Sequence, residues 1–281
     1  MKRRHLSSLA AMAFAALFVG PSSALAQAYL GTNLTPYAVL AGTTVTCTGA
    51  SLVTGDVGVS PGSAITGFPA PCTNVGTSRI PPASDPGQAA LLTAYGTLAA
   101  QPCSSTVGPD LAGLTLVQGV YCVNAAASNL TGTLTLDAQG NPNAVWVFRM
   151  SSSLITSSGS TVAVVNGGNA CGVEWQVSSS ATIGSGTTFV GNILALTSIA
   201  LNTGANLTGR ALARNGAVTL DTNNISFGAC GAGGGPGGPP PPFPPGPVPT
   251  LPEIGAWALL VVLLGSGAYA LSRRTPTEAS R

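Results

Sequence analysis

The stretch "GTTFVGNILALTSIALNTGANLTGRALARNGAVTLDTNNIS", residues 186–226, decides the fold because it repeats itself. Written in rows of eighteen residues, it aligns so that one column is apolar and holds Phe189, Leu207 and Ile225. Side chains of a strand point alternately to its two sides, so this column is expected to point inward and its neighbours outward. Short strands in a repeat of this length predict one coil of a β-solenoid per row.

Other columns of the repeat support the same interpretation. A second apolar column holds Ile183, Leu201 and, one residue late, Leu220. Gly191 and Gly209 share a column, where we expect the chain to turn a corner that admits no side chain. Fainter copies begin at Ser128 ("SNLTGTLTLD") and at Gly49 ("GASLVTGDVGV"). Because copies occur near both ends of the repeat-bearing domain, the coils are not expected to stack in simple chain order.

One segment breaks the repeat and predicts a helix over residues 84–101. Ser84 or Asp85 can serve as its N-cap, and Pro86 suits its first turn. Its apolar stripe consists of Leu91, Leu92, Tyr95, Leu98 and Ala99. An amphipathic helix must bury this stripe, so we expect it to cover one side of the solenoid.

The first 27 residues are typical of a secretory signal. Lys2, Arg3 and Arg4 precede an apolar run, and Ala24-Leu25-Ala26 forms a cleavage site before Gln27 or Ala28. A transmembrane anchor is the less favoured alternative because the apolar run is short. The domain organisation predicted from here on is a solenoid domain over residues 28–230 and a Gly/Pro-rich linker over residues 231–249.

The C-terminal region, residues 250–281, contains an apolar segment at residues 254–271 that is closed by Arg273 and Arg274. Eighteen helical residues at about 1.5 Å each give roughly 27 Å, enough to span a bilayer core. With Val248-Pro249-Thr250-Leu251 before it, this region resembles the IPTL-type C-terminal sorting signals of Gram-negative bacteria. The resemblance implies that the apolar segment is inserted in the membrane at first. It also implies that a sorting protease then processes the tail and passes the protein to the cell surface. A plain membrane anchor is the alternative.

The predicted domain holds all six cysteines, Cys47, Cys72, Cys103, Cys122, Cys171 and Cys230. An even number in an exported chain indicates disulfides, although the sequence alone leaves every pairing open. We favour the pairs 47–72, 103–122 and 171–230 because each closes a local or terminal loop. A metal site is the rival interpretation, and it is disfavoured because Cys-x-x-Cys spacing and histidine are both lacking.

Charge is scarce in residues 28–230, where six acidic residues against four arginines leave a net charge of about −2. Such a surface offers no basic patch for nucleic acid. The acids are scattered, and the sole histidine, His5, lies in the signal, so we predict no enzyme, no cofactor and no metal. Arg210 and Arg214 are expected to be solvated, whereas Trp146 and Trp175 are expected to be buried.

Five segments together resemble the microbial ice-binding-protein-like family: "LGTNLTPYAVLAGTTVT", "GDVGVSPGSAITGFP", "GVYCV", "GTLTLDAQGNPNAVWVF" and "GTTFVGNILALTSIALNTGANLTGRALARNGAVTLDTN". The resemblance runs from about Leu30 to Ile225. It implies an all-β fold, a right-handed discontinuous β-solenoid of triangular cross-section with one long α-helix packed alongside. It also implies that the N-terminal segment completes coils near the C-terminal ones.

Ice offers an oxygen lattice and no pocket, so a protein that binds it needs a rigid, flat and weakly polar surface. Adjacent coils lie about 4.7–4.9 Å apart, and threonine carries a hydroxyl and a methyl group on a stiff side chain. The resemblance adds a family turn pattern of Thr, then Ala or Gly, any residue, then Thr or Asn, which residues 203–206 match and residues 185–188 match with Ser first. The candidate ice-binding residues are Ser185, Thr187, Thr188, Thr203, Asn206, Thr208, Asn224 and Ser226.

The sequence therefore predicts an exported protein, displayed at the cell surface or extracellular, whose partner is the surface of an ice crystal. It predicts no nucleic-acid partner. The alternative is a cell-surface adhesin or structural coat module on the same fold without ice activity. Threonine, serine and asparagine also suit exposed strands and turns that bind nothing.

Overall fold

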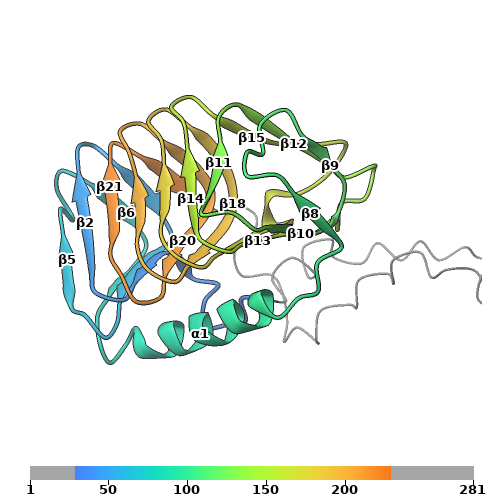
Figure 1. Ribbon diagram of the computed structural model, residues 1–281. Coiled ribbons are helices and arrows are strands. Elements are labelled where there is room, and N and C mark those ends of the chain that lie inside the picture. The colour runs from blue at the N-terminus through green and yellow to red at the C-terminus, as the bar shows by residue number, and fades with distance from the viewer. Residues whose placement is uncertain (1–28, 229–281) are drawn as a thin grey trace, which may run out of the picture. The chain divides into compact units, whose positions relative to one another are not determined.

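The strands of the computed structural model, which describes residues 29–228, stack in parallel and wind around one core (Figure 1). Each coil contributes a strand to up to three faces. Face A contains β8 (Ser105–Val107), β10 (Gly119–Val123), β13 (Trp146–Met150), β16 (Val173–Val177), the C-terminal halves of β18 (Thr188–Ala195) and β20 (Asn206–Ala213), β1 (Tyr37–Ala41), β4 (Asp56–Val59) and β7 (Ser78–Arg79). A short 3-10 helix, η1 (Ala170–Gly172), precedes β16.

Face B is a separate seven-stranded sheet, seen from outside in Figure 1. Its order is β11 (Ala127–Leu130), β14 (Ser153–Thr156), β17 (Ala181–Ile183), β19 (Ile199–Leu201), β21 (Val218–Asp221), β2 (Thr44–Thr48) and β5 (Ala64–Thr66). Face C contains β9 (Thr115–Leu116), β12 (Thr133–Asp137), β15 (Thr161–Val165), the N-terminal halves of β18 and β20, β22 (Asn224–Ser226), β3 (Leu52–Thr54) and β6 (Thr73–Val75).

The coils do not follow chain order, as predicted. Strand β1 pairs in parallel with β20, while β2 pairs with β21 and β3 with β22. The N-terminal strands therefore continue the stack beyond the C-terminal ones, and blue strands stand beside orange ones in Figure 1. The solenoid is discontinuous because the first coils in sequence are the last coils in space.

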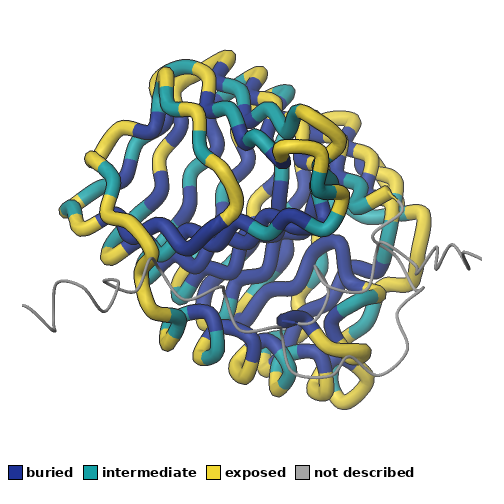
Figure 2. The backbone as a smooth tube through the Cα atoms, turned by 90° about the vertical axis from the view of Figure 1, so that its right-hand side faces the viewer, coloured by how far each residue is buried: buried dark blue, intermediate teal, exposed yellow. Residues whose placement is uncertain are grey.

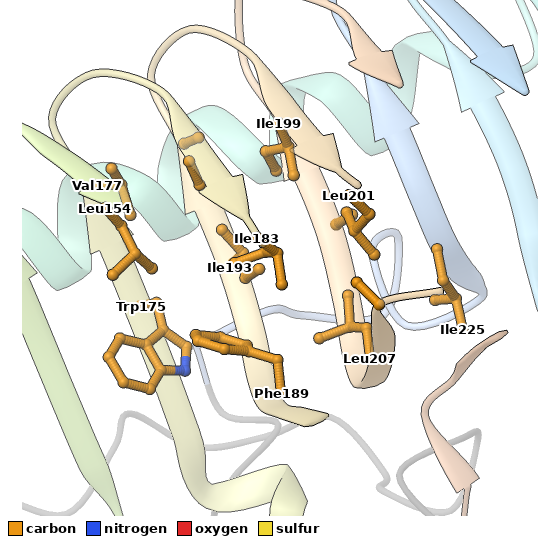
Figure 3. Packing of buried hydrophobic residues seen from close by; sticks show 14 of the residues in the cluster. Leu154, Trp175, Val177, Ile183, Phe189, Ile193, Ile199, Leu201, Leu207 and Ile225 are labelled. Carbon is orange, nitrogen blue, oxygen red and sulfur yellow. The ribbon is translucent and has the colours of Figure 1, made fainter. Parts of the chain in front are cut away.

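The two apolar columns of the repeat point inward, also as predicted. Phe189 pairs with Leu207 and Leu207 with Ile225, and all three are buried. Ile183, Leu201 and Leu220 are buried as the second column, and Figure 3 shows Ile183 and Leu201 beside the first. Burying an aliphatic or phenyl side chain of this size contributes about 1.5–3 kcal/mol, so the repeat supplies the core directly.

An aromatic stack runs through the coils at one end of this core. Ring centroids are 5.7 Å apart for Tyr121 and Phe148, 4.1 Å for Phe148 and Trp175, and 4.9 Å for Trp175 and Phe189. Trp146 is buried too, so both tryptophans lie inside, as expected. Each indole N–H donates to a backbone carbonyl, that of Leu116 or Val190, which satisfies the buried polar atom.

The predicted helix forms as α1 (Asp85–Ala99) and lies along face A, against β1, β13, β16 and β18. Ser84 is its N-cap and Pro86 lies in its first turn. Its buried residues are Gly87, Leu91, Ala94, Tyr95 and Leu98. The prediction is wrong for Leu92, which is 52 % exposed because the buried stripe follows the 3.6-residue period and leaves it on the outer side.

Two of the favoured disulfides are present, Cys47–Cys72 and Cys103–Cys122. Cys171 is disulfide-bonded as well, and its predicted partner Cys230 lies outside the described residues. The signal, the linker and the C-terminal region are likewise outside them. Within residues 29–228, no helix has the length and apolar character needed to cross a membrane.

Candidate functional site

Face A is not available as a contact surface, because α1 and the N-terminal segment of residues 29–35 cover it. Leu30 and Leu34 of that segment are buried. Beneath it, the side chains that β16, β18 and β20 turn outward are almost completely buried as well: Glu174, Asn192 and Arg210. Strands β1, β4, β10 and β16 of this face are buried along their whole length, and Figure 2 shows long buried stretches of the chain with exposed residues gathered at many of the turns.

The three polar side chains of face A form a ladder across consecutive coils. Asn192 Nδ2 donates to Glu174 Oε1 at 3.0 Å, and Arg210 Nη1 donates to Asn192 Oδ1 at 3.1 Å. Arg210 Nη2 donates to the carbonyl of Thr35 at 3.1 Å, and its guanidinium lies over the ring of Phe227 at 4.3 Å. The expectation that Arg210 is solvated is therefore wrong, because the N-terminal segment packs over it.

Burial shifts both charged members of the ladder toward their neutral forms. Desolvation raises the pKa of Glu174 to about 8, although its hydrogen bond with Asn192 and the charge of Arg210 act in the opposite direction. Desolvation lowers the pKa of Arg210 to about 10, opposed by Glu174. The ladder ties coils together inside the protein and is closed to solvent, so it cannot be the functional surface.

Face B presents an unbroken ladder of outward side chains, one from each strand. Every neighbouring pair in this ladder is in register, and every member is exposed or partly exposed. In spatial order its residues are Asn129, Ile155, Thr182, Ala200, Thr219, Thr46 and Thr66. Four threonines and no charge occur among the seven, and Ile155 is 42 % exposed although it is a large apolar residue.

Among residues 29–228, the carboxylates nearest to the ladder of face B lie at its margins. Asp110 bridges to Asn129 at the first strand, and its carboxylate accepts hydrogen bonds from the hydroxyl of Thr131 and the N–H of Ala112. These bonds, the one from Thr131 foremost, lower the pKa of Asp110. Asp221 ends β21 at the turn toward face C. The interior of the face is thus free of the strongly hydrated groups that would hold liquid water over it.

Face C carries five of the eight predicted residues. Thr188 pairs with Asn206 and Asn206 with Asn224, while Thr208 pairs with Ser226 in the next outward column. All are at least partly exposed. The structure extends the first column to Thr133 and Thr161 on one side and to Leu52 and Thr73 on the other. Sequence reasoning missed these four because the repeat loses its eighteen-residue spacing there.

The remaining three predicted residues do not lie on face C. Ser185 and Thr203 lie in the turns between faces B and C, and the hydroxyl of Thr203 donates to the carboxylate of Asp221. Thr187 is fully buried, and its hydroxyl lies 3.1 Å from that of Thr156 and 3.1 Å from the carbonyl of Ser157. The expectation that Thr187 faces a ligand is therefore wrong, because its side chain fills the inside of the turn.

The turns between faces B and C form a regular ladder of their own. The backbone N–H of Gly186 donates to the backbone carbonyl of Thr203 at 3.1 Å, and the N–H of Gly204 donates to the backbone carbonyl of Asp221 at 3.1 Å. One coil further, the backbone N–H of Thr222 donates to the backbone carbonyl of Thr48 at 3.1 Å. Gly186 and Gly204 have φ of +64° and +72°, and a side chain there would meet no neighbour. The corner between the two faces is therefore periodic.

The faces differ in how continuous they are. On face B each of the seven strands pairs with its neighbour in register. On face C, β15 and β18 share only the pair Thr161 and Thr188, because β18 bends at Gly191 while β15 runs straight to Val165. Face B is thus the more continuous of the two arrays.

No group of three or more His, Cys, Asp or Glu side chains gathers in residues 29–228 in a way that could hold a metal ion. The outward columns named above for faces B and C hold no charged residue, and the carboxylates of Asp221 and Asp137 lie where β21 and β12 end. What the arrangement offers is a repeating set of hydroxyl, amide and methyl groups at the coil spacing of about 4.7–4.9 Å. Such a surface can order water, but it has no groups for acid–base or nucleophilic chemistry.

Comparison with known proteins agrees with this geometry. A sequence model described as "Ice-binding-like" matches residues 39–226. An ice-binding protein of Nostoc sp. (strain HG1) is 47% identical over 228 residues, 80% of this chain and 83% of that protein.

Solved structures show the same likeness. The crystal structure of an ice-binding protein from an Antarctic biological consortium has 42% identity and a TM-score of 0.66, covering 69% of this chain and 88% of that one. That of the ascomycete Antarctomyces psychrotrophicus has 36% identity and a TM-score of 0.66, covering 69% of this chain and 95% of that one. With its fold, its repeat and these relatives in agreement, the chain belongs to the ice-binding-like family.

Proposed function

We propose that this protein binds ice and limits its growth, and that face B is the principal contact surface. The observation that carries the proposal is the unbroken outward ladder of seven uncharged side chains, from Asn129 to Thr66. Its relatives in Nostoc and in the Antarctic consortium are ice-binding proteins by name. Their function supports the same activity here.

The physical reason lies in the kinds of interaction that an ice surface can form. A crystal of water has no charge to pair and no cavity to fill, so affinity must come from many weak contacts made at once. A rigid surface makes these contacts without losing conformational entropy on binding. Threonine suits the task because its side chain is stiff at χ1, so the hydroxyl and methyl groups are already in place. Parallel coils supply the constant repeat.

Scarce charge serves the same purpose. Carboxylate and guanidinium groups bind water strongly in arrangements that a crystal lattice does not share. Arg210 and Glu174 are removed from the surface into the ladder of face A, and Arg79 pairs with Asp56 at 2.6 Å. Asp110 and Asp221 remain at the margins of face B. We propose no catalytic role for any of these groups.

Export and display complete the proposal. The signal of residues 1–27 directs export, and two disulfides in the described domain suit an oxidising compartment. We infer that residues 231–249 hold the domain away from the cell, while residues 250–281 engage the membrane until a sorting protease removes them. An adhesin or coat module would use the same layout, so only the ice experiments separate the two functions.

The substitution Thr219→Tyr tests the proposal at the centre of face B. Tyrosine would project beyond the ladder and keep the neighbouring side chains off the lattice. The purified domain, residues 28–230, is the object to test, because the described part has an extensive hydrophobic core and two internal disulfides. The wild-type domain is expected to reshape growing ice crystals and show thermal hysteresis, and Thr219→Tyr is expected to lose most of both.

A matched control is Thr93→Tyr, which makes the same change on the exposed side of α1, away from faces B and C. It should retain full activity, and both variants should melt at the wild-type temperature because both positions are exposed. Ordinary disc-shaped crystals and no hysteresis from the wild-type domain would reject ice binding and favour the adhesin. Equal losses in the two variants would reject face B as the contact surface.

A further inference from the structure

We infer that face C is a second ice-contacting plane, separate from face B, so that one molecule can hold two crystal planes at once. This inference rests on the proposed function. It concerns the five predicted residues that the structure places away from face B: Thr188, Asn206, Thr208, Asn224 and Ser226.

The first support is that face C is an array in two directions. Along the coils, Thr188, Asn206 and Asn224 are in register, and the column continues to Leu52 and Thr73. Along each strand, a second outward residue follows two positions later, as Thr208 follows Asn206 and Thr54 follows Leu52. Two residues of a strand span about 6.6 Å, so the outward groups lie on a grid rather than in a single line.

The second support is the chemistry of this grid. The second column consists of Val190, Thr208, Ser226, Thr54 and Val75, again in register. Hydroxyl, amide and aliphatic groups occur together over β18, β20, β22, β3 and β6, and none of the outward side chains in these two columns is charged. The composition matches that of face B, so whatever favours ice on one face favours it on the other.

The third support is that face C is open. Helix α1 and residues 29–35 lie on face A, on the far side of the bend at Gly191 and Gly209. In the described part of the chain, Leu52 and Val75 on face C remain 39% and 57% exposed although they are apolar. Exposed aliphatic side chains set between hydroxyl groups are costly for a surface that meets only liquid water. The same side chains cost less on a surface that contacts an ice crystal.

The two faces are joined but not coplanar. The corner between them is the hydrogen-bonded ladder of turns through Gly186 and Gly204, and the polypeptide changes direction there to begin a new face. One flat crystal surface therefore cannot touch both faces together. A molecule held by face B still presents face C, either to a second plane at a crystal edge or to a neighbouring crystal.

The experiment compares three variants with the same substitution: Thr208→Tyr on face C, Thr219→Tyr on face B and Thr93→Tyr on α1. Fluorescently labelled domain, residues 28–230, is adsorbed to a single-crystal ice hemisphere, and the planes that fluoresce are recorded. The wild-type domain and Thr93→Tyr should label two sets of planes. Thr208→Tyr should lose one set, Thr219→Tyr should lose the other, and the double variant should lose both.

Each other outcome has a distinct meaning. If Thr208→Tyr labels the same planes as the wild-type domain while Thr219→Tyr labels none, face C takes no part and the inference is overturned, although ice binding stands. If the wild-type domain labels no plane, the proposed function itself has failed. Unchanged melting temperatures and circular dichroism would show that any lost planes do not reflect unfolding.

Discussion

At the scale of single residues, the buried carboxyl of Glu174 is a costly arrangement. Its Oε1 accepts from Asn192 Nδ2, but its Oε2 is buried and has no hydrogen-bond partner among residues 29–228. The neutral acid is the form that such a site favours, which is why the pKa of Glu174 rises to about 8. The pKa of Tyr29 is raised to about 12, mainly because the phenol is desolvated by burial and to a smaller extent because of the charge of Glu174.

This residue makes stability depend on pH. An unfolded chain ionises Glu174 near its ordinary pKa of 4.5, whereas the folded protein does so near 8, so the folded state binds more protons between these values. Protonated Glu174 therefore contributes fully to the free energy of unfolding below about pH 4.5, and this contribution is lost as the pH rises to about 8. The total loss is on the order of a few kcal/mol. Thermal melts between pH 4 and pH 9 should show this decline.

The variant Glu174→Gln isolates the contribution. Its amide oxygen can still accept from Asn192, but the group no longer titrates, so the decline between pH 4.5 and pH 8 should become much shallower. Parallel pH profiles for the variant and the wild-type domain would show that another group is responsible. Arg210, which faces Glu174 across Asn192, titrates only near pH 10 and lies outside the measured window.

At the scale of elements, the two glycine columns have different tasks. Gly209, with φ of +155°, bends β20 between faces C and A, and a Cβ there would lie 1.9 Å from the carbonyl oxygen of Gly191. Gly204, with φ of +72°, turns the chain between faces B and C, where a Cβ would meet nothing. Position 209 excludes a side chain because a Cβ would clash with the neighbouring coil, whereas position 204 requires only a backbone with positive φ.

The pair of variants Gly209→Ala and Gly204→Ala separates these two costs. Gly204→Ala should lower the free energy of unfolding by about 1–2 kcal/mol, the usual cost of a left-handed residue with a side chain. Gly209→Ala must also push two coils apart, so it should cost several kcal/mol or prevent folding. Denaturant unfolding of both variants checks the order. Equal losses would show that backbone conformation alone decides at Gly209.

At the scale of the whole molecule, the coil at the β5–β6–β7 end has a neighbouring coil on only one side within residues 29–228. Its strands are short, and the only strand of this described part that pairs with β5 (Ala64–Thr66) is β2. The disulfide between Cys47 and Cys72 joins this coil to the one before it, across 25 residues. Closing a loop of that length in the unfolded chain stabilises the fold by about 3.5 kcal/mol in the chain-entropy treatment.

Replacing both cysteines in the pair Cys47→Ser and Cys72→Ser should therefore loosen this end first. Hydrogen exchange is expected to accelerate in β5, β6 and β7, while β16, β18 and β20 at the centre keep their protection. The melting temperature should fall. Uniformly faster exchange over all coils would contradict this, because it would mean that the solenoid opens as a single unit.

The sequence by itself determined the coil. Phe189, Leu207 and Ile225 recur at a constant interval, and alternation within each strand decides which side chains are inside, so the solenoid, its inward columns and its corner glycines were all predictable. The covering helix was predictable from its caps and apolar stripe. The predicted ice-contact residues stay a prediction, although five of them share one face.

Only the tertiary structure decided which outward residues are available and which face is the more continuous. Thr187 looks exposed in its motif but fills the inside of a turn, and Arg210 looks solvated but lies beneath residues 29–35. The ladder of face B joins Thr219 to Thr46, residues far apart in the chain, because the first coils stack on the last. A local pattern can assign a side chain to one side of its strand, but it cannot reveal what another part of the chain places over that side.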